Sequence, residues 1–172
     1  MTETLYSGSF VNLKKNGNWE YVERVNDVSA VVIMAVLPNQ ELLLVEQFRP
    51  PVNCSVIELP AGLVGDDSPE NFLDAARREL FEETGYVAEK WQHIVSGPLV
   101  PGISSECIHL LAASGLNKTG YGGGVLNENI TVHKVPWLDF EDWIKTKQDQ
   151  GYMIDPKVYT LWFYASSLGA TD

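Results

Sequence analysis

Arg78-Glu79-Leu80-Phe81-Glu82-Glu83-Thr84-Gly85-Tyr86 is the most informative stretch of this chain of 172 residues. On an α-helix, positions three and four apart share a face, so Glu79, Glu82 and Glu83 project from one stripe. Carboxylates crowded in this way repel one another unless a cation joins them, and hard oxygen ligands suit Mg²⁺ or Mn²⁺. The stretch therefore predicts a helix that holds a divalent metal ion, although a glutamate-rich helix face exposed to solvent is the alternative.

Residues upstream extend the pattern. The segment E-L-P-A-G-L occupies residues 58–63, and Glu70 lies eight positions before Arg78. A glutamate pair alone would indicate only a solvated face, but chance does not account for Arg78, Leu80, Gly85 and Glu70 at these spacings. The whole pattern resembles the signature helix of the Nudix hydrolases, which cleave nucleoside diphosphates linked to another group.

The loop before Glu70 departs from the family pattern. That pattern usually has five residues between the glycine and the first glutamate, whereas Gly62 and Glu70 enclose seven, Leu63 to Pro69. We interpret residues 65–69, G-D-D-S-P, as a loop lengthened by two residues, which costs little conformational entropy. Because the longer loop changes the spacing before Glu70, the match to the family pattern is weakest for the role of Glu70.

Composition bounds the class of protein. A hydrophobic content of 45% and a charged content of 20% fit one soluble globular domain. The net charge of −11 argues against nonspecific binding to nucleic acid or to an anionic membrane. An anionic substrate would then need local positive charge, which implies a divalent metal ion and one or two arginines at the site.

The sequence also favours a cytoplasmic location. Its two cysteines, Cys54 and Cys107, form no disulfide framework and are expected to be buried free thiols. The first residues lack the basic and apolar regions of a secretory signal, and the longest apolar run, Ala30 to Leu37, is too short to span a bilayer.

Apolar periodicity predicts strands and helices in a mixed order. A β-hairpin is expected at residues 9–14 and 19–25, because Asn16-Gly17 is a strong turn signal. The further strands are expected at 28–37, 41–48, 56–59, 91–99, 107–113 and 130–136. Pro60-Ala61-Gly62 is expected to be a turn.

Three helices complete the predicted fold. The signature helix should begin with Ser68 as its N-cap and Pro69 in its first position, and should end at Gly85. Two more are expected at 138–148 and 156–168. We predict an α/β fold, an α/β/α sandwich of the Nudix type with a mixed sheet. Residues 1–27 would form an N-terminal β-hairpin used in dimerisation and nucleobase contact, and residues 28–172 the hydrolase domain.

The resemblance implies roles for individual residues of the metal site. It implies that Glu79, Glu82, Glu83 and the backbone carbonyl of Ala61 hold the metal. Arg78 would orient the glutamates through a salt bridge and, with Glu82, belongs to the expected catalytic set.

The general base is expected outside the signature helix. In such enzymes it often lies on a mobile loop before a late strand, and Glu128 in E-N-I-T-V-H matches that glutamate. Gly122-Gly123-Gly124 would be a flexible hinge that brings Glu128 to the substrate. An ordinary exposed glutamate is the alternative, and a helix glutamate remains open as the base.

A second resemblance narrows the branch. Residues 43–51, L-L-V-E-Q-F-R-P-P, are similar to the ADP-ribose and ADP-sugar pyrophosphatases, in which the matching arginine, here Arg49, contacts the diphosphate. Pro101-Gly102 follows Gly85 at the sixteen-residue distance typical of that branch. Leu63 and Gly102 are therefore expected to contact substrate. A strand-end arginine paired with a surface acid and a plain turn are the alternatives.

Nucleobase recognition is expected from the N-terminal segment. In the relatives, aromatic residues that match Phe10 and Trp19 sandwich adenine, one from each subunit of a dimer. Glu20 would accept a hydrogen bond from the base edge, and Arg24 would contact ribose or phosphate. Ordinary strand packing is the alternative for both aromatic residues.

The resemblance implies hydrolysis of the pyrophosphate of nucleoside diphosphate sugars. ADP-ribose is the leading substrate and Mg²⁺ the expected cofactor, with Mn²⁺ as a substitute. We expect a homodimer that binds neither nucleic acid nor membrane. A preference for GDP-mannose or another sugar nucleotide is the rival within this class. A sensor that binds ADP-ribose-like ligands without turnover is the rival of another class, and the complete set of glutamates argues against it.

Overall fold

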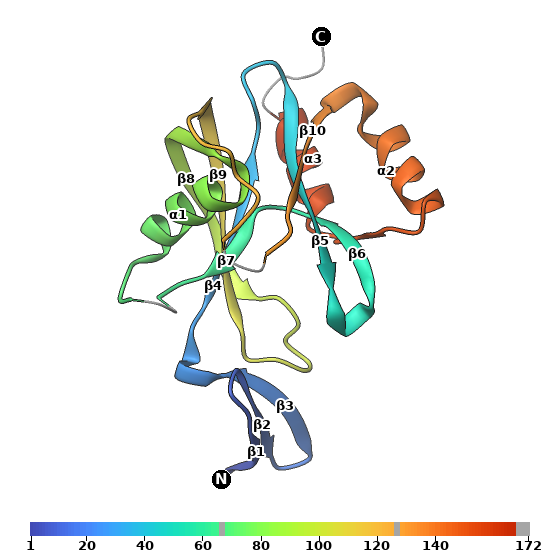
Figure 1. Cartoon of the computed structure of the whole chain (residues 1–172). Coiled ribbons are helices and arrows are strands. Elements are labelled where there is room, and N and C mark those ends of the chain that lie inside the picture. The colour runs from blue at the N-terminus through green and yellow to red at the C-terminus, as the bar shows by residue number, and fades with distance from the viewer. Residues whose placement is uncertain (66–67, 126–127, 168–172) are drawn as a thin grey trace.

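The computed structural model describes residues 1–65, 68–125 and 128–167, which form two mixed sheets, three α-helices and a separate N-terminal sheet (Figure 1). The strands are β1 (Thr2–Ser7), β2 (Val11–Asn16), β3 (Trp19–Arg24), β4 (Ala30–Ala35), β5 (Glu41–Arg49), β6 (Cys54–Glu58), β7 (Ala61–Leu63), β8 (Tyr86–Pro98), β9 (Cys107–Lys118), β10 (Thr131–Pro136) and β11 (Met153–Ile154). The helices are α1 (Phe72–Thr84), α2 (Phe140–Asp149) and α3 (Val158–Ser167).

The two larger sheets confirm the mixed α/β fold. One has the order β7-β4-β9-β8 and the other β10-β5-β6-β11. The pairs β4–β9 and β6–β11 are parallel, and the remaining pairs are antiparallel. In Figure 1, α1 lies on one side of the molecule, and α2 and α3 lie on the other, with the sheets between them.

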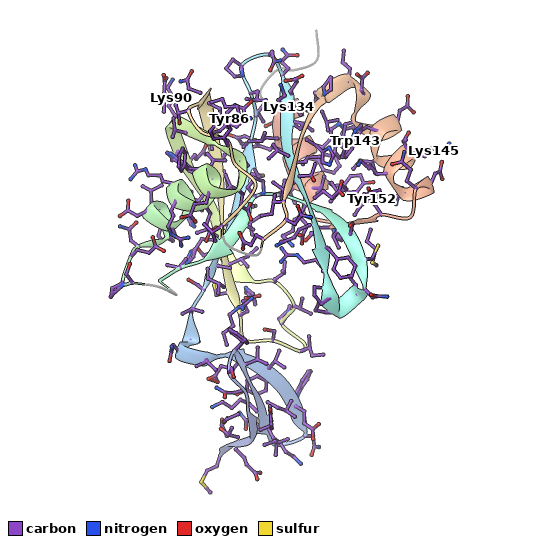
Figure 2. All side chains as sticks on the ribbon, viewed as in Figure 1. Tyr86, Lys90, Lys134, Trp143, Lys145 and Tyr152 are labelled. Atoms are coloured by element: carbon purple, nitrogen blue, oxygen red, sulfur yellow. The ribbon has the colours of Figure 1, made fainter. Side chains whose placement is uncertain are left out.

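Strand β4 lies between two hydrophobic cores. Its residues Val31 and Ile33 pack in one core with Leu80 of α1, whereas Val32 and Met34 pack in the other core with residues of α2 and α3. A strand buried on both faces is an uninterrupted apolar run, which is why residues 30–37 were recognisable as a strand. Figure 2 labels Tyr86 on the α1 side, and Trp143 and Tyr152 on the other.

Helix α1 begins later than predicted. Its N-cap is Asn71, whose side-chain oxygen accepts hydrogen bonds from the amides of Leu73 and Asp74, each at 3.0 Å. The predicted cap at Ser68 is wrong because Asn71 satisfies the free amides of the first turn three residues further on. The predicted end is correct: Gly85 has a left-handed φ of 74° and donates its amide to the carbonyl of Phe81.

The N-terminal segment has one strand more than predicted. The hairpin of β2 and β3 turns at Gly17, and β1 adds to its free edge. All residues of β1 are exposed, so no buried apolar face marks this strand in the sequence. Backbone hydrogen bonds tie the sheet to the loop after β8: Val22 donates to Ile103 at 2.9 Å, and Ser105 donates to Val22 at 3.1 Å.

Other strand limits also differ from the prediction. Residues 61–63 form strand β7 instead of a turn, because they pair with β4. Strand β8 begins at Tyr86 rather than 91, β9 extends to Lys118, and β11 was not predicted. Helices α2 and α3 begin about two residues after the predicted starts, and the predicted end of α3 at 168 lies outside the described residues.

The helices and the two cysteines can also be compared with the sequence. No helix among the described residues is long and apolar enough to cross a membrane. Cys54 and Cys107 are free thiols, but both are half-buried rather than buried.

Candidate active site

Arg78 of α1 is the centre of a hydrogen-bonded network that reaches the segment before the helix and strand β7. Its Nη1 atom donates to Glu79 at 2.8 Å and to Glu82 at 3.1 Å. Its Nη2 atom donates to Glu70 at 2.7 Å and to the carbonyl of Leu63 at 3.0 Å. Glu70 therefore reaches the network despite the lengthened loop, of which residues 66–67 lie outside the described part of the chain.

The hydrogen bonds of this network stabilise the charged forms of Arg78 and Glu70. The hydrogen bond to Glu70, followed by the charges of the helix glutamates, raises the pKa of Arg78 above its ordinary value. The same hydrogen bond from Arg78 holds the pKa of Glu70 below its ordinary value. A permanently charged guanidinium thus lies between carboxylates, which is the geometry expected of a residue that orients them.

Glu83 is buried next to β7. It is only 5% exposed, and its Oε2 atom accepts a hydrogen bond of 3.1 Å from the amide of Ala61. Burial raises the pKa of Glu83 to about 9, and the charges of Glu79 and Glu128 add to the rise. Burial likewise raises the pKa of Glu79 to about 7, with Arg78 opposing the rise and Glu128 adding to it. These two carboxylates need positive charge that the described residues supply only in part.

Gly62 allows β7 to approach α1 closely. A Cβ atom at this position would lie 1.9 Å from the carboxylate carbon of Glu79, so a larger residue would displace that glutamate. The site therefore requires glycine at position 62 of the E-L-P-A-G-L segment, because the Glu79 carboxylate occupies the space that a side chain would take. The sequence marked this glycine as part of a motif without revealing which side chain needs the space.

Arg49 lies within electrostatic reach of the helix carboxylates. Its Nε atom pairs with Glu58 on the neighbouring strand at 2.7 Å, and its charge lowers the pKa of Glu83. Arg49 therefore lies beside the site and is also paired with an acidic residue, as the alternative of a strand-end arginine with an acidic partner had predicted. Glu58 was missed because the ion pair joins two strands and its residues are not direct neighbours in the strand register, which sets Arg49 opposite Cys54.

Glu128 approaches the same carboxylates from a distant part of the sequence. Its charge raises the pKa of both Glu79 and Glu83, and its Oε2 atom accepts a hydrogen bond of 3.0 Å from the amide of Val125. The preceding glycines are not a free hinge, because the amides of Gly123 and Gly124 donate to the last turn of α1.

Five of the expected substrate-contact residues line two cavities. The first, of about 360 Å³, lies between β3 and the loop after β8 and includes Trp19 and Gly102 in its wall. The second, of about 290 Å³, includes Phe10, Arg24 and Leu63. The second cavity adjoins the Arg78 network, because Leu63 belongs to both.

The two aromatic residues line different cavities within one chain. Phe10 is 81% exposed and Trp19 is 65% exposed, so neither ring is packed in a core. Glu20 lines neither of the two cavities. Arg24 forms an ion pair with Glu106, a partner that the sequence did not reveal because the two residues lie on segments far apart in the chain.

The site fits a hard divalent cation by its donor chemistry. Glu79, Glu82 and Glu83 offer carboxylate oxygens, and burial leaves two of them short of positive charge. In the part of the chain that the structure describes, however, no three His, Cys, Asp or Glu side chains are arranged ready to hold a metal ion. Arg78 donates to one oxygen of Glu79 and to one oxygen of Glu82, and each carboxylate carries a second oxygen that could bind a cation.

Residues 26–162 match the family model described as the NUDIX domain. The chain belongs to the Nudix family. It is a Nudix hydrolase, and Nudix hydrolases generally use divalent metal ions.

Relatives of this Nudix hydrolase carry different names. A methanol dehydrogenase activator of Bacillus methanolicus is 32% identical over 92% of this chain and 83% of its own length. An ADP-ribose pyrophosphatase of Bacillus subtilis is 34% identical over 67% of this chain and 64% of its own. A GDP-mannose pyrophosphatase of Yersinia enterocolitica is 31% identical over 78% and 75%.

A solved structure supports the fold. The crystal structure of an ADP compounds hydrolase superposes with a TM-score of 0.73, covering 98% of this Nudix hydrolase and 91% of that chain at 18% identity.

Proposed function

We propose that this protein hydrolyses the pyrophosphate of nucleoside diphosphate sugars, with ADP-ribose as the leading substrate. The products would be a nucleoside monophosphate and a sugar phosphate. The observation that carries the proposal is the convergence of Glu79, Glu83 and Glu128 beside Arg78, next to a cavity lined by Arg24 and Leu63. A diphosphate needs this combination of metal-binding carboxylates and nearby arginines.

Mg²⁺ is the proposed cofactor, with Mn²⁺ as a substitute. Glu79, Glu82, Glu83 and the carbonyl of Ala61 would hold it. When bound, such a cation neutralises phosphate charge and lowers the pKa of a bound water. The burial of Glu83 would strengthen its attraction to the cation, because water screens the charges less there.

The residues around the cation site have separate proposed roles. Arg49 would bind the diphosphate, and its contact with Glu58 keeps the guanidinium at the end of β5. Arg78 would orient Glu79 and Glu82. Glu128 would accept the proton of the attacking water, because it is a carboxylate near the others yet is contributed by a separate loop.

The nucleobase would bind through the N-terminal sheet of a homodimer. The exposure of Phe10 and Trp19 supports this proposal, since each ring is free to stack on a base or on a second subunit. Arg24 and Glu20 would contact the nucleoside, and Gly102 would border the cavity that Trp19 lines. The net charge of −11 supports a protein that binds neither nucleic acid nor membrane, and the free thiols support a cytoplasmic location.

One assay tests the substrate class. The protein, with Mg²⁺ and a phosphatase, is supplied with ADP-ribose, GDP-mannose and other sugar nucleotides, and phosphate is measured with malachite green. Intact sugar nucleotides resist the phosphatase, whereas their hydrolysis products release phosphate. We expect the highest kcat/KM for ADP-ribose. A higher value for GDP-mannose would establish the rival, and no release from any substrate would favour the non-catalytic sensor.

A second candidate function is activation of a dehydrogenase. The Bacillus methanolicus relative matches 92% of this chain, and its name describes an activator. Turnover of a methanol dehydrogenase with and without this protein tests that candidate. If the dehydrogenase turnover still increases with a variant in which the α1 glutamates are replaced, activation does not depend on hydrolysis.

A further inference from the structure

The loop after β9 is bonded to the C-terminal end of α1. The amides of Thr119 and Gly120 both donate to the carbonyl of Gly85 at 2.9 Å. Further along, the amide of Gly123 donates to the carbonyl of Glu83 at 2.7 Å, and that of Gly124 donates to the carbonyl of Glu82 at 3.0 Å. The last carbonyls of a helix have no partner within the helix, so these bonds satisfy groups that would otherwise need water.

Gly122 of the loop and Gly85 of the helix end have no room for side chains. A Cβ atom on Gly122 would lie 2.4 Å from the carbonyl carbon of Thr84, and one on Gly85 would lie 2.3 Å from the carbonyl oxygen of Gly120. The φ angles of Gly122, Gly123 and Gly124 are 73°, 107° and 83°, a region that residues with side chains rarely adopt. Close approach and backbone conformation therefore both require glycine at position 122, whereas at position 123 only the backbone conformation does.

Glu128 rests directly on this segment. A Cβ atom on Gly124 would lie 2.6 Å from Oε2 of Glu128 and 2.7 Å from its Cβ atom. The amide of Glu128 donates to the carbonyl of Val125 at 2.9 Å, and the amide of Ile130 donates to the carbonyl of Gly123 at 3.2 Å. The backbone around Glu128 is thus held on both sides.

We propose that Gly122, Gly123 and Gly124 form a clamp that holds Glu128 in fixed register with the glutamates of α1, and that Gly124 is a positioning residue for Glu128. The amides of Gly123 and Gly124 bond to the backbone carbonyls of Glu83 and Glu82, and the side chains of these same two glutamates belong to the site. One set of backbone bonds therefore couples the loop carboxylate to the helix carboxylates. The catalytic part of this inference rests on the proposed function, in which Glu128 is the general base.

Gly124→Ala tests the positioning role. The added methyl group displaces the Glu128 carboxylate, and we expect kcat for ADP-ribose to fall on the order of tenfold to a hundredfold while KM changes little, since small misplacements of a reacting group have effects of this size. Gly151→Ala is the matched control. Gly151 also has a positive φ, 91°, but apart from Gly151 itself and its two chain neighbours no atom of the described residues lies within 4 Å of the place that its Cβ would take, so the variant isolates backbone strain. Its kcat should remain within about twofold of wild type.

A double variant separates positioning from general damage. In a Glu128→Gln background the base is already absent, so adding Gly124→Ala should lower kcat no further. Fully additive losses, or an unchanged kcat in Gly124→Ala alone, would overturn the positioning role.

Hydrogen exchange tests the clamp without any activity. The amides of Gly123 and Gly124 should exchange slowly in wild type, and Gly122→Ala should speed both while leaving the amide of Gly151, bonded to Gln148, unchanged. If Gly122→Ala fails to fold, the wild-type rates still decide. Exchange of both amides at the rate of an unstructured peptide would overturn the clamp. Slow exchange in a protein that hydrolyses no sugar nucleotide would instead uphold the clamp and reject the proposed function.

Discussion

The carboxylates of α1 differ in their surroundings although they lie on one helix. Glu82 keeps contact with Arg78, whereas Glu83 is buried and accepts a hydrogen bond from the amide of Ala61. Burial disfavours the ionised form, and a divalent cation would restore it. The same burial that destabilises the ionised metal-free protein would thus favour metal binding.

Metal-free protein should lose stability as pH rises. The pKa of Glu83 in the fold is about 9 and that of Glu79 about 7, both above the ordinary value of 4.5. Above pH 4.5 the folded protein therefore holds more protons than the unfolded chain, so this stabilisation is full below about pH 4.5 and is lost as pH approaches 9. With EDTA present, Tm should fall by on the order of 5 °C between about pH 5.5 and 8.5.

The variant Glu83→Gln tests whether Glu83 causes the predicted fall of Tm with rising pH. The variant cannot ionise at this position, so its Tm in EDTA should fall less steeply, and Mg²⁺ at about pH 8.5 should raise the Tm of wild type more than that of the variant. Equal slopes in the two proteins would show that Glu83 is not the titrating group.

Glu83→Gln should also abolish most of the catalysis. The substitution keeps the shape of the side chain but removes a negative charge from the cation site, so we expect kcat to fall at least about a hundredfold. Stability of the metal-free protein at neutral pH should change little, because a pKa of about 9 keeps Glu83 largely uncharged there, as glutamine is. Glu141→Gln, at an exposed position of α2, is the control for losing one carboxylate elsewhere. Full activity of Glu83→Gln would contradict the mechanism.

At the scale of elements, the proposed cation site and Glu128 are brought together by one helix, one short strand and one loop. Strand β7 brings Ala61 and Gly62 against α1, and the loop before β10 brings Glu128 to its C-terminal end. These elements come from distant parts of the sequence, so their meeting depends on the pairing of β4 with β7 and β9.

Glu128→Gln should separate chemistry from binding. A general base acts mainly in the transition state, so kcat should fall while KM for ADP-ribose stays nearly constant. Steady-state kinetics on the variant checks this, again with Glu141→Gln for comparison. A changed KM with an unchanged kcat would make Glu128 a binding residue and would move the base to the helix.

The sequence predicted the elements whose signals are local. The glutamate spacing and Gly85 identified α1, and continuous apolar runs identified β4 and β5, because each signal lies within the element itself. The start of α1 was wrong because Ser68 and Asn71 are both good caps, and only the folded chain shows which one meets the free amides.

Nonlocal features of the site were not predictable from one sequence. Glu58 lies on the strand next to that of Arg49, and Glu106 lies in the loop just before β9, so these two ion pairs follow from how the elements pack rather than from sequence spacing. Strand β7 has three residues, too few for a periodic pattern. The triple glycine was predicted to be a flexible hinge, but it is bonded to the end of α1, because a run of glycines does not by itself distinguish a hinge from a tightly packed segment.

At the scale of the whole molecule, the N-terminal sheet stands apart from the two hydrophobic cores (Figure 1). It exposes Leu5, Tyr6, Phe10, Val11 and Trp19. Strand edges and apolar side chains exposed in this way are usually covered by a partner. We therefore expect a homodimer in which this sheet contributes to the nucleobase site.

Trp19→Ala should weaken substrate binding through loss of stacking. We expect KM for ADP-ribose to rise by an amount equivalent to roughly 1–3 kcal/mol, with kcat largely unchanged. Phe163→Ala is a matched control, because Phe163 is also 65% exposed but lies on α3. Light scattering should give a mass of roughly twice 19.1 kDa. A monomer at micromolar concentration together with unchanged kinetics of Trp19→Ala would remove both the dimer and the shared site.

Product analysis of ADP-ribose tests the central claim most directly. The protein is incubated with ADP-ribose and Mg²⁺, and the products are separated by anion-exchange chromatography, in parallel with a sample containing EDTA. We predict equal amounts of AMP and ribose 5-phosphate in the Mg²⁺ sample and intact ADP-ribose in the EDTA sample. Intact ADP-ribose in both samples, or cleavage that is unaffected by EDTA, would contradict a metal-dependent pyrophosphatase.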